Sequence, residues 1–409
     1  MTPGRPVPSP PATPTEAATV PRLPWRRLAV LGGLSTFGPL STDLYLSALP
    51  DLTRRLHAGD SLGQATLSLC VIGLAVGQLV TGPLSDRFGR RRPMLVGVGA
   101  FALLSAGCAL APSIEVLLVL RFAQGLAGGA GLVIARAMVR DLYQGREAAR
   151  VFSLIMLFAG AAPVCGPLAG GLVLRFTDWR GTFVVLAAVG LVLLLAATTL
   201  PETHGRATST DGGSTRRELL RLLSQRRFRT YAGLLGTTSV VLFTYISMSS
   251  YVLQDGEGLT SGQYSLVFAL NAAGLVGAGQ LNRRLLLRVS PERLAAAATT
   301  ASLATATLLV VSLAFGPPLW LLLPGLFVLV ASVGCTTPNA TALALDDAGR
   351  VAGTAAALLG CVQYLLGALV PPLVSGDHAT ATALVGTVCV AATASAVLAR
   401  YGTRPARTA

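Results

Sequence analysis

The chain has 409 residues, of which 52% are hydrophobic and 12% are charged, whereas average soluble proteins carry roughly 25% charged residues. A chain this long and this apolar cannot bury its hydrophobic side chains in one soluble core, which excludes an ordinary soluble protein. The net charge of +14 does not indicate nucleic-acid binding, because the basic residues form short clusters between apolar runs and not one basic face.

Twelve apolar segments follow one another along the chain. Each approaches the roughly 20 residues needed to cross the hydrocarbon core of a bilayer. Backbone in lipid must satisfy its own hydrogen bonds, so each segment is predicted to be a transmembrane helix and the fold to be all-α. The segments are residues 28–49, 62–84, 93–111, 114–138, 150–175, 180–199, 230–253, 263–286, 293–315, 318–343, 352–375 and 379–399.

The polar regions divide the chain into two six-helix bundles. The first 24 residues are rich in Pro and Thr and lack the apolar core of a signal peptide, so residues 1–24 are predicted to be a disordered cytoplasmic tail. The longest interruption, 201–229, predicts a cytoplasmic linker. The bundles then span 25–200 and 230–400, followed by a second cytoplasmic tail at 401–409.

The distribution of arginine predicts the orientation in the membrane. If the N-terminus is inside, the outer loops hold only four of the 32 basic residues, namely Arg54, Arg55, Arg175 and Arg180. Inner loops of membrane proteins are enriched in Lys and Arg. We therefore expect both termini to be cytoplasmic, and a multi-pass protein of a bacterial inner membrane.

The first predicted helix contains an acid, Asp43, seven residues before Pro50. An ionisable residue inside a membrane helix is costly and is by default a functional-site hypothesis. At about 1.5 Å per residue, Asp43 and Arg121 of the fourth helix should lie at similar depths, roughly 10 and 12 Å below the outer surface. We expect them to communicate directly or through water, with Asp43 taking up a proton. A static buried pair that fixes helix packing is the alternative.

The loop after the second helix combines glycines, an acid and a basic run. It resembles motif A of the major facilitator superfamily, G-xxx-D-[RK]-x-G-[RK]-[RK], at every required position. The glycines would allow close helix approach and a sharp turn, and the acid could pair with an arginine or cap a helix. Such contacts would bias one transport state against the other. The matching residues are Gly82, Asp86, Arg87, Gly89, Arg90 and Arg91.

Two further stretches are similar to motifs of the same superfamily. A glycine-rich stretch of the fourth helix that begins at Arg121 is similar to motif B, whose arginine is associated with proton coupling. The fifth helix resembles motif C, which marks antiporters of the drug-efflux families, although general helix packing is the alternative explanation. The motif C positions are Gly160, Pro163, Gly166, Pro167 and Gly170.

Polar or aromatic residues of five helices are candidates for a substrate cavity between the bundles, where transporters of this kind bind their cargo. Each has helix packing or interhelical hydrogen bonding as its alternative role. The candidates are Tyr45, Gln124, Tyr245, Asn271, Gln363 and Tyr364. The six cysteines lie in apolar runs without metal-binding spacing, and the three histidines lie in loops, so no metal, cofactor or enzymatic site is expected.

Residues 28–400 resemble the Bcr/CflA drug:proton antiporters most closely within that superfamily. The likeness is carried by residues 39–50 of the first helix, by Arg140–Asp141 after the fourth helix and by Pro201–Glu202–Thr203 after the sixth. It implies twelve helices in two pseudo-symmetric bundles, alternating access, and export of small molecules by a monomer driven by protons. One departure is the loop after the eighth helix, which copies motif A poorly because it lacks the acid.

Three functions remain open from the sequence. The first is proton-coupled export of drugs or metabolites, with a preference for neutral substrates because Asp43 is the single deep acid. The second is an uncoupled facilitator, an importer or an amino-acid exporter. The third is a membrane sensor that has kept the fold, which fits poorly with an intact motif A.

Overall fold

The computed structural model describes residues 25–142, 145–203, 220–221, 223–314, 318–346 and 352–402. At some of these, including Asp86 and much of the stretch 145–160, it describes the backbone alone. The described residues form helices and no strand. The predicted N-terminal tail, residues 403–409 of the predicted C-terminal tail and most of the predicted linker lie outside the described residues.

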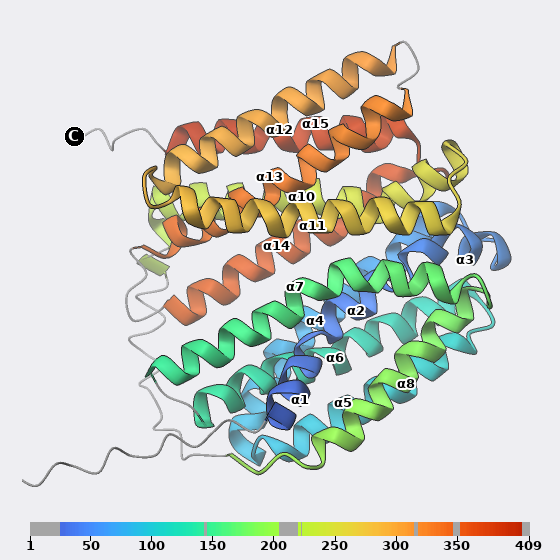
Figure 1. Cartoon of the computed structure of the whole chain (residues 1–409), viewed down its shortest axis with the longest axis vertical. Coiled ribbons are helices and arrows are strands. Elements are labelled where there is room, and N and C mark those ends of the chain that lie inside the picture. Colours follow the sequence, from blue (N-terminus) through green and yellow to red (C-terminus); the bar gives the residue numbers. More distant parts are fainter. Residues whose placement is uncertain are drawn as a thin grey trace, which may run out of the picture.

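The N-terminal half contains five long helices and a broken first helix (Figure 1). Its elements are α1 (Trp25–Ser35), α2 (Phe37–Asp43), η1 (Leu46–Ala48), α3 (Leu49–Arg55), α4 (Asp60–Phe88), α5 (Arg91–Ala109), α6 (Ile114–Leu142), α7 (Gly145–Val173) and α8 (Trp179–Ala197).

The C-terminal half forms the second layer in Figure 1, and its long helices run roughly alongside those of the first. Its elements are α10 (Arg226–Tyr251), the π-helical turn η2 (Val252–Gly256), α11 (Ser261–Leu285), α12 (Pro291–Leu313), α13 (Leu319–Leu345), α14 (Ala352–Ser375) and α15 (Ala381–Gly402).

The lengths and hydropathy of the helices confirm a multi-pass membrane protein. Ten helices among the described residues are long and apolar enough to span a bilayer. The 29-residue α7 and the broken first helix supply the two remaining predicted segments. The all-α, twelve-helix fold predicted from the sequence is therefore confirmed.

The first helix differs from the continuous segment expected over 28–49. It is interrupted after Ser35 and again after Asp43, where η1 continues with a 3₁₀ turn. The local sequence explains the second interruption. Ser41 and Thr42 direct their hydroxyls back to the carbonyls of Gly38 and Pro39, at 2.9 Å each, and such bonds often bend helices.

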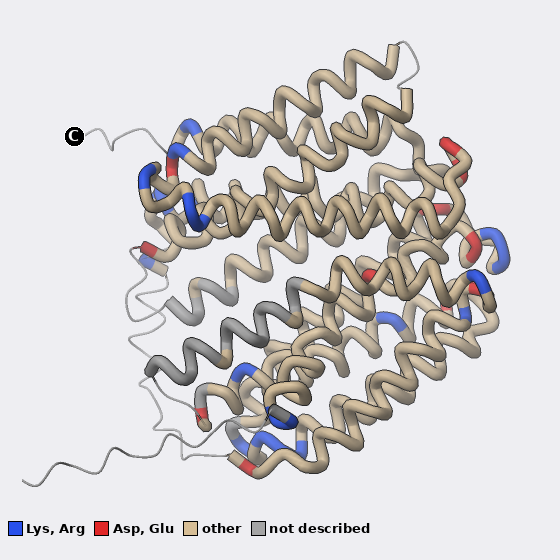
Figure 2. The backbone as a smooth tube through the Cα atoms, viewed as in Figure 1, with Lys and Arg blue, Asp and Glu red and all other residues tan. Residues whose placement is uncertain are grey.

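The two ends of the bundle differ in charge (Figure 2). Arginines gather at one end, where α4 passes into α5, where α10 begins and where α11 passes into α12. We call this the basic end. The opposite end carries the loops after α3, α7, η2 and α14. The polar contacts described at the basic end join elements of the same half, as between Arg227 and Asp346, 2.8 Å apart.

Candidate functional site

Asp43 is the last residue of α2 and lies at the break of the first helix. Its side chain is only 5% exposed. Its Oδ1 lies 3.0 Å from the Thr42 hydroxyl, which shares its single proton between this oxygen and the Pro39 carbonyl. Among the acids in the described part of the chain, Asp43 is the one placed deep within the membrane-spanning region, because the others lie at helix ends or in loops. The predicted membrane acid therefore lies at a point where the backbone is already irregular.

The glycines of the motif C stretch face this break from α7. A Cβ at Gly166 would lie 3.1 Å from the Asp43 Cβ, and a Cβ at Gly170 would overlap the Leu44 carbonyl oxygen. Gly170 therefore requires glycine if α7 is to approach the break this closely, whereas a Cβ at position 166 would make a tight contact that Asp43 could relieve only by moving. Pro163 and Pro167 lie within α7, whose helix continues through them. The sequence indicated close packing here, but not that the packing partner is the segment bearing Asp43.

Arg121 of α6 is completely buried, and its guanidinium is held by neutral groups. It donates to the Ser41 carbonyl at 2.9 Å, to the Thr66 carbonyl at 3.3 Å and to Gln124 Oε1 at 2.5 Å. It also lies 4.3 Å from the centre of the Tyr45 ring, within cation–π range.

Arg121 therefore contacts the first helix two residues before Asp43. Within the residues that the structure describes, it forms no ion pair with that acid. Communication between Asp43 and Arg121 stays a prediction, and the described contacts that could carry it reach Ser41 and Tyr45, two residues on either side of Asp43.

Two of the predicted cavity residues surround Arg121 inside the N-terminal half. Tyr45 and Gln124 are both completely buried. Tyr45 shares a hydrogen bond with the Thr66 hydroxyl at 3.1 Å, and Gln124 donates to the Ser105 hydroxyl at 2.7 Å. In this conformation, these two side chains hold Arg121 in place.

The other four cavity candidates lie in the C-terminal half. Asn271 of α11 donates to the Tyr245 hydroxyl of α10 at 2.9 Å, and both side chains are buried. Gln363 of α14 is half-buried, whereas the neighbouring Tyr364 is 41% exposed and packs edge-on against Phe243. Tyr245 and Asn271 therefore form a pair, while Gln363 and Tyr364 lie on a different helix.

The motif A loop forms a polar cluster within the N-terminal half. α4 ends at Gly89, whose positive φ of 87° favours glycine, as the predicted sharp turn requires. The backbone N–H groups of Arg90 and Arg91 donate to the Glu202 carboxylate at 2.7 and 3.2 Å, which caps the start of α5. Arg90 also pairs with Asp141 at 3.0 Å.

Other motif A positions are less engaged in this conformation. Arg87 stacks over the Phe88 ring at 5.3 Å. Among the described residues, no atom lies within 4 Å of where a Gly82 side chain would begin, so the close helix approach expected there is not seen. The side chain of Asp86 lies outside the described residues.

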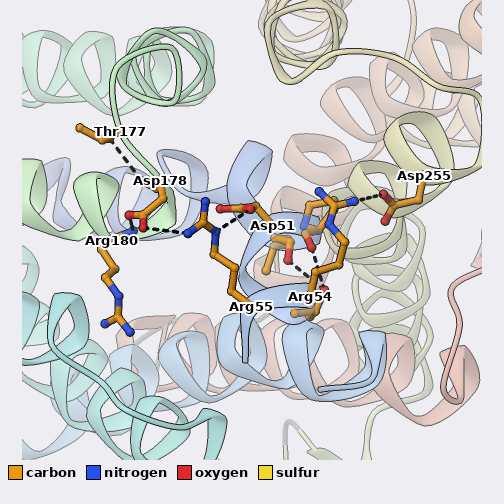
Figure 3. Close-up of polar contacts among 10 residues, drawn as sticks. Asp51, Arg54, Arg55, Thr177, Asp178, Arg180 and Asp255 are labelled. Atoms are coloured by element: carbon orange, nitrogen blue, oxygen red, sulfur yellow. Dashed lines mark hydrogen bonds and ion pairs between the residues drawn. The ribbon is translucent and has the colours of Figure 1, made fainter. Parts of the chain in front are cut away.

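The end opposite the basic end carries charged contacts that the sequence did not single out (Figure 3). Arg54 of α3 pairs with Asp255 of η2 at 2.7 Å, which joins the two halves. Arg55 lies between Asp51 and Asp178, at 2.9 and 3.4 Å. These side chains are partly exposed to solvent, from 30% for Asp178 to 65% for Arg54, and exposed ion pairs contribute about 0–1 kcal/mol each. Charged loop residues in sequence carry no signal of such pairing.

The two halves also meet through the backbone at this end. The Asp60 N–H donates to the Asp377 carbonyl at 3.1 Å, and the Asp60 carboxylate accepts from the Ala379 N–H at 2.8 Å. Deeper in, Ser375 donates to Gln64 at 2.7 Å and Ser68 donates to the Ala368 carbonyl. The halves are therefore joined at the end opposite the basic end.

The sequence of this two-part helical chain matches a known family. The family model described as "Major Facilitator Superfamily" matches residues 31–371. The chain belongs to the major facilitator superfamily. It is accordingly a multi-pass membrane transporter and not an enzyme.

Relatives within the superfamily include proteins named for drug resistance. The chain is 38% identical over 366 residues to the uncharacterized MFS-type transporter YdgK of Bacillus subtilis, covering 86% of this chain and 89% of the relative. It is 31% identical to a chloramphenicol resistance protein of Pseudomonas aeruginosa (88% and 89% covered). It is 29% identical to a bicyclomycin resistance protein homolog of Haemophilus influenzae (85% and 88% covered).

Solved structures of the superfamily share the fold. A bacterial homolog of the human lysosomal transporter Spinster matches with a TM-score of 0.73 at 15% identity, covering 92% of this chain and 97% of that structure. The D-xylose–proton symporter matches with a TM-score of 0.70 at 16% identity, with 93% and 97% covered. At these identities the likeness concerns the fold alone.

Proposed function

We propose that this transporter exports small molecules from the cytoplasm in exchange for protons, with Asp43 as the proton site. The observation that carries the proposal is the position of Asp43, buried at the break of the first helix and packed against the motif C glycines of α7. An ionised carboxylate without a cationic partner is costly in the membrane interior. Loss or gain of a proton there would change how the break packs against α7.

The arrangement of the halves is consistent with alternating access. The Arg-rich loops favour a cytoplasmic basic end, so the contacts at the opposite end would close the pathway to the outside. The structure would then represent a state accessible from the cytoplasm, in which an exporter collects its cargo. The motif A contacts of Arg90 and Arg91 remain within the N-terminal half in this state.

The substrate class follows from the relatives and from the sparse charge of the interior. The named resistance proteins suggest phenicol- or bicyclomycin-type antibiotics. Arg121, the base near Asp43, is engaged by neutral acceptors, so neutral or zwitterionic molecules fit better than dications. An uncoupled facilitator or an amino-acid exporter is the alternative, and it would tolerate loss of the Asp43 carboxyl.

The test compares the wild type with Asp43→Asn at equal expression in an efflux-deficient bacterium. The panel contains phenicols, bicyclomycin, sulfonamides and cationic dyes. We expect resistance to one class, and its loss in the variant to the level of the empty vector. Reconstituted protein should release protons from the binding site on adding that drug, as read with a pH-sensitive dye, and Asp43→Asn should not.

Asp51→Asn is the matched control, because Asp51 belongs to the same broken helix but lies at its exposed end, paired with Arg55. It should leave resistance unchanged. Full resistance in Asp43→Asn would refute the proton site while leaving export in place. No resistance to any compound in the wild type would favour the metabolite exporter, to be followed by amino-acid efflux measurements.

A further inference from the structure

Five polar side chains form one hydrogen-bonded cluster where the first helix meets the C-terminal half. They are Ser47, Ser250, Gln254, Ser261 and Ser265, which we call the Ser–Gln network. Ser47 comes from η1, Ser250 from α10, Gln254 from η2, and the last two from α11. None lies in motif A, B or C, and the functional site described above does not use them.

Each donor of the network has a defined acceptor. The Ser250 hydroxyl donates to the Leu46 carbonyl at 2.7 Å. The Gln254 amide donates to the Ser47 carbonyl at 3.3 Å and to the Ser250 hydroxyl at 2.8 Å, while its oxygen accepts from Ser261 at 2.9 Å. Because the Ser265 proton goes to the Ser261 carbonyl, the Ser47 hydroxyl is the donor in its 2.8 Å contact with Ser265.

The network forms hydrogen bonds with the irregular backbone of the first helix. Pro50 has no N–H, so the Leu46 carbonyl lacks the partner that a continuous helix would give it, and Leu49 reaches it instead in a tighter turn. Its second lone pair accepts from Ser250. On the other side, the π-helical turn η2 carries Gln254 towards this backbone, and such turns often occur at functional sites.

The network adjoins both features of the proposed proton site. Ser47 follows Asp43 by four residues across the break. Gly171, beside the motif C stretch, must lack a side chain because a Cβ there would overlap the Ser265 hydroxyl. Charged groups around the network are Asp43, four residues before Ser47, the Arg54–Asp255 pair, and Arg175, whose guanidinium would lie 3.7 Å from a Cβ at Gly262, next to Ser261. Tyr264 contacts Ser249 of α10 at 3.3 Å.

From this geometry we infer that the Ser–Gln network couples the charge state of Asp43 to opening at the end opposite the basic end. The inference rests on the proposed function. Three of its hydrogen bonds cross between the halves: Ser250 to Leu46, Gln254 to Ser47, and Ser47 to Ser265. Ser47, Ser250 and Ser265 are buried, whereas Gln254 and Ser261 are half-buried. Hydrogen bonds shielded from water in this way favour one arrangement. Rearrangement of the break on protonation would remove the acceptors, and the halves would separate there.

The test measures how fast a buried cysteine becomes accessible from that end. The six native cysteines are replaced, and Ala368→Cys serves as reporter, because Ala368 is 1% exposed and its carbonyl accepts from Ser68 of the other half. Labelling by a membrane-impermeant maleimide is followed in right-side-out membranes. The four proteins compared are the reporter alone, with Asp43→Asn, with Gln254→Ala, and with both.

Because asparagine mimics the neutral, protonated acid, we expect Asp43→Asn to increase the labelling rate at least about fivefold, the lower end of ordinary allosteric coupling. Gln254→Ala should increase labelling, and Asp43→Asn should then have no further effect. Ser250→Ala, a smaller change, should act in the same direction as Gln254→Ala and guards against misfolding of one variant. Variants are compared only where elution from gel filtration matches that of the reporter protein.

Gln64→Ala is the matched control, because Gln64 also accepts a serine hydrogen bond across the halves but does not touch the break. It should increase labelling and preserve the effect of Asp43→Asn. An effect of Asp43→Asn that is equally large with and without Gln254 would overturn the inference, as would an unchanged rate in Asp43→Asn itself. Because labelling needs no substrate, either result is separate from failure of export in the resistance assay.

Discussion

At the scale of single residues, the structure separates two buried charges that the sequence placed at similar depths. Arg121 is held by three neutral acceptors and a tyrosine ring, while the Asp43 carboxyl has the Thr42 hydroxyl as its described partner. An arginine satisfied in this way is suited to a fixed structural role, because its fork-shaped donors match several acceptors at once. The acid is the member of the two whose interactions can change with a proton.

Because Gln124 accepts a hydrogen bond from Arg121, we predict that replacing Gln124 lowers the stability of the protein. Gln124→Leu removes the closest acceptor of a fully buried guanidinium, and leaving such a donor unsatisfied costs about 1–3 kcal/mol, more for a charged group. We expect a lower midpoint in thermal unfolding of the detergent-solubilised protein.

Ser105→Ala provides the comparison, since Ser105 bonds Gln124 but not the arginine. It should destabilise less than Gln124→Leu. Equal effects of the two substitutions would contradict a supporting role of Gln124 for the guanidinium.

At the scale of elements, the broken first helix and α7 form a unit. Proline, serine and threonine interrupt the helix around Asp43, and glycines of α7 let the irregular backbone approach closely. The stretch that resembles motif C, identified as a pattern of small residues, therefore forms the surface of α7 against which the break packs. The pattern of glycines in the sequence could not name its partner, because the two elements are more than 100 residues apart.

The close packing of α7 against the break predicts that alanine cannot replace Gly170 without displacing a neighbour. Gly170→Ala would push α7 from the Leu44 carbonyl, and overpacking of this kind costs about 1–3 kcal/mol. Thermal stability and transport should both fall.

Gly277→Ala is its control. Gly277 lies inside α11 with no atom within 4 Å of a Cβ at that position, so alanine there should be neutral or stabilising by about 0.4–1 kcal/mol. Comparable losses at both positions would argue against a specific contact at Gly170.

At the scale of the whole molecule, the two ends of the bundle differ. The halves are joined at the end opposite the basic end, and the arginine-rich loops lie at the basic end. The orientation in the membrane decides which side of the bilayer the joined end faces. If the basic end lies in the cytoplasm, as we propose, the joined end is the closed outer gate.

The orientation is testable with two exposed positions in the cysteine-free protein. Thr177→Cys, at the joined end, should react with an impermeant maleimide in intact cells. Leu287→Cys, which replaces a side chain 85% exposed at the basic end, should react only after the membrane is opened. The reverse pattern would invert the topology and turn the proposed outer gate into an inner one.

The sequence by itself determined the membrane class, the helix number and the family, because apolar length and short motifs are local properties of the chain. It also located Asp43, Arg121 and the turn at Gly89. Only the tertiary structure decided that Arg121 bonds the Ser41 backbone, that Tyr45 and Gln124 surround it, and that Ser47, Ser250 and Gln254 join the halves. Serine and glutamine are common in helices, and their hydrogen bonds depend on which distant backbone groups the fold leaves without a partner.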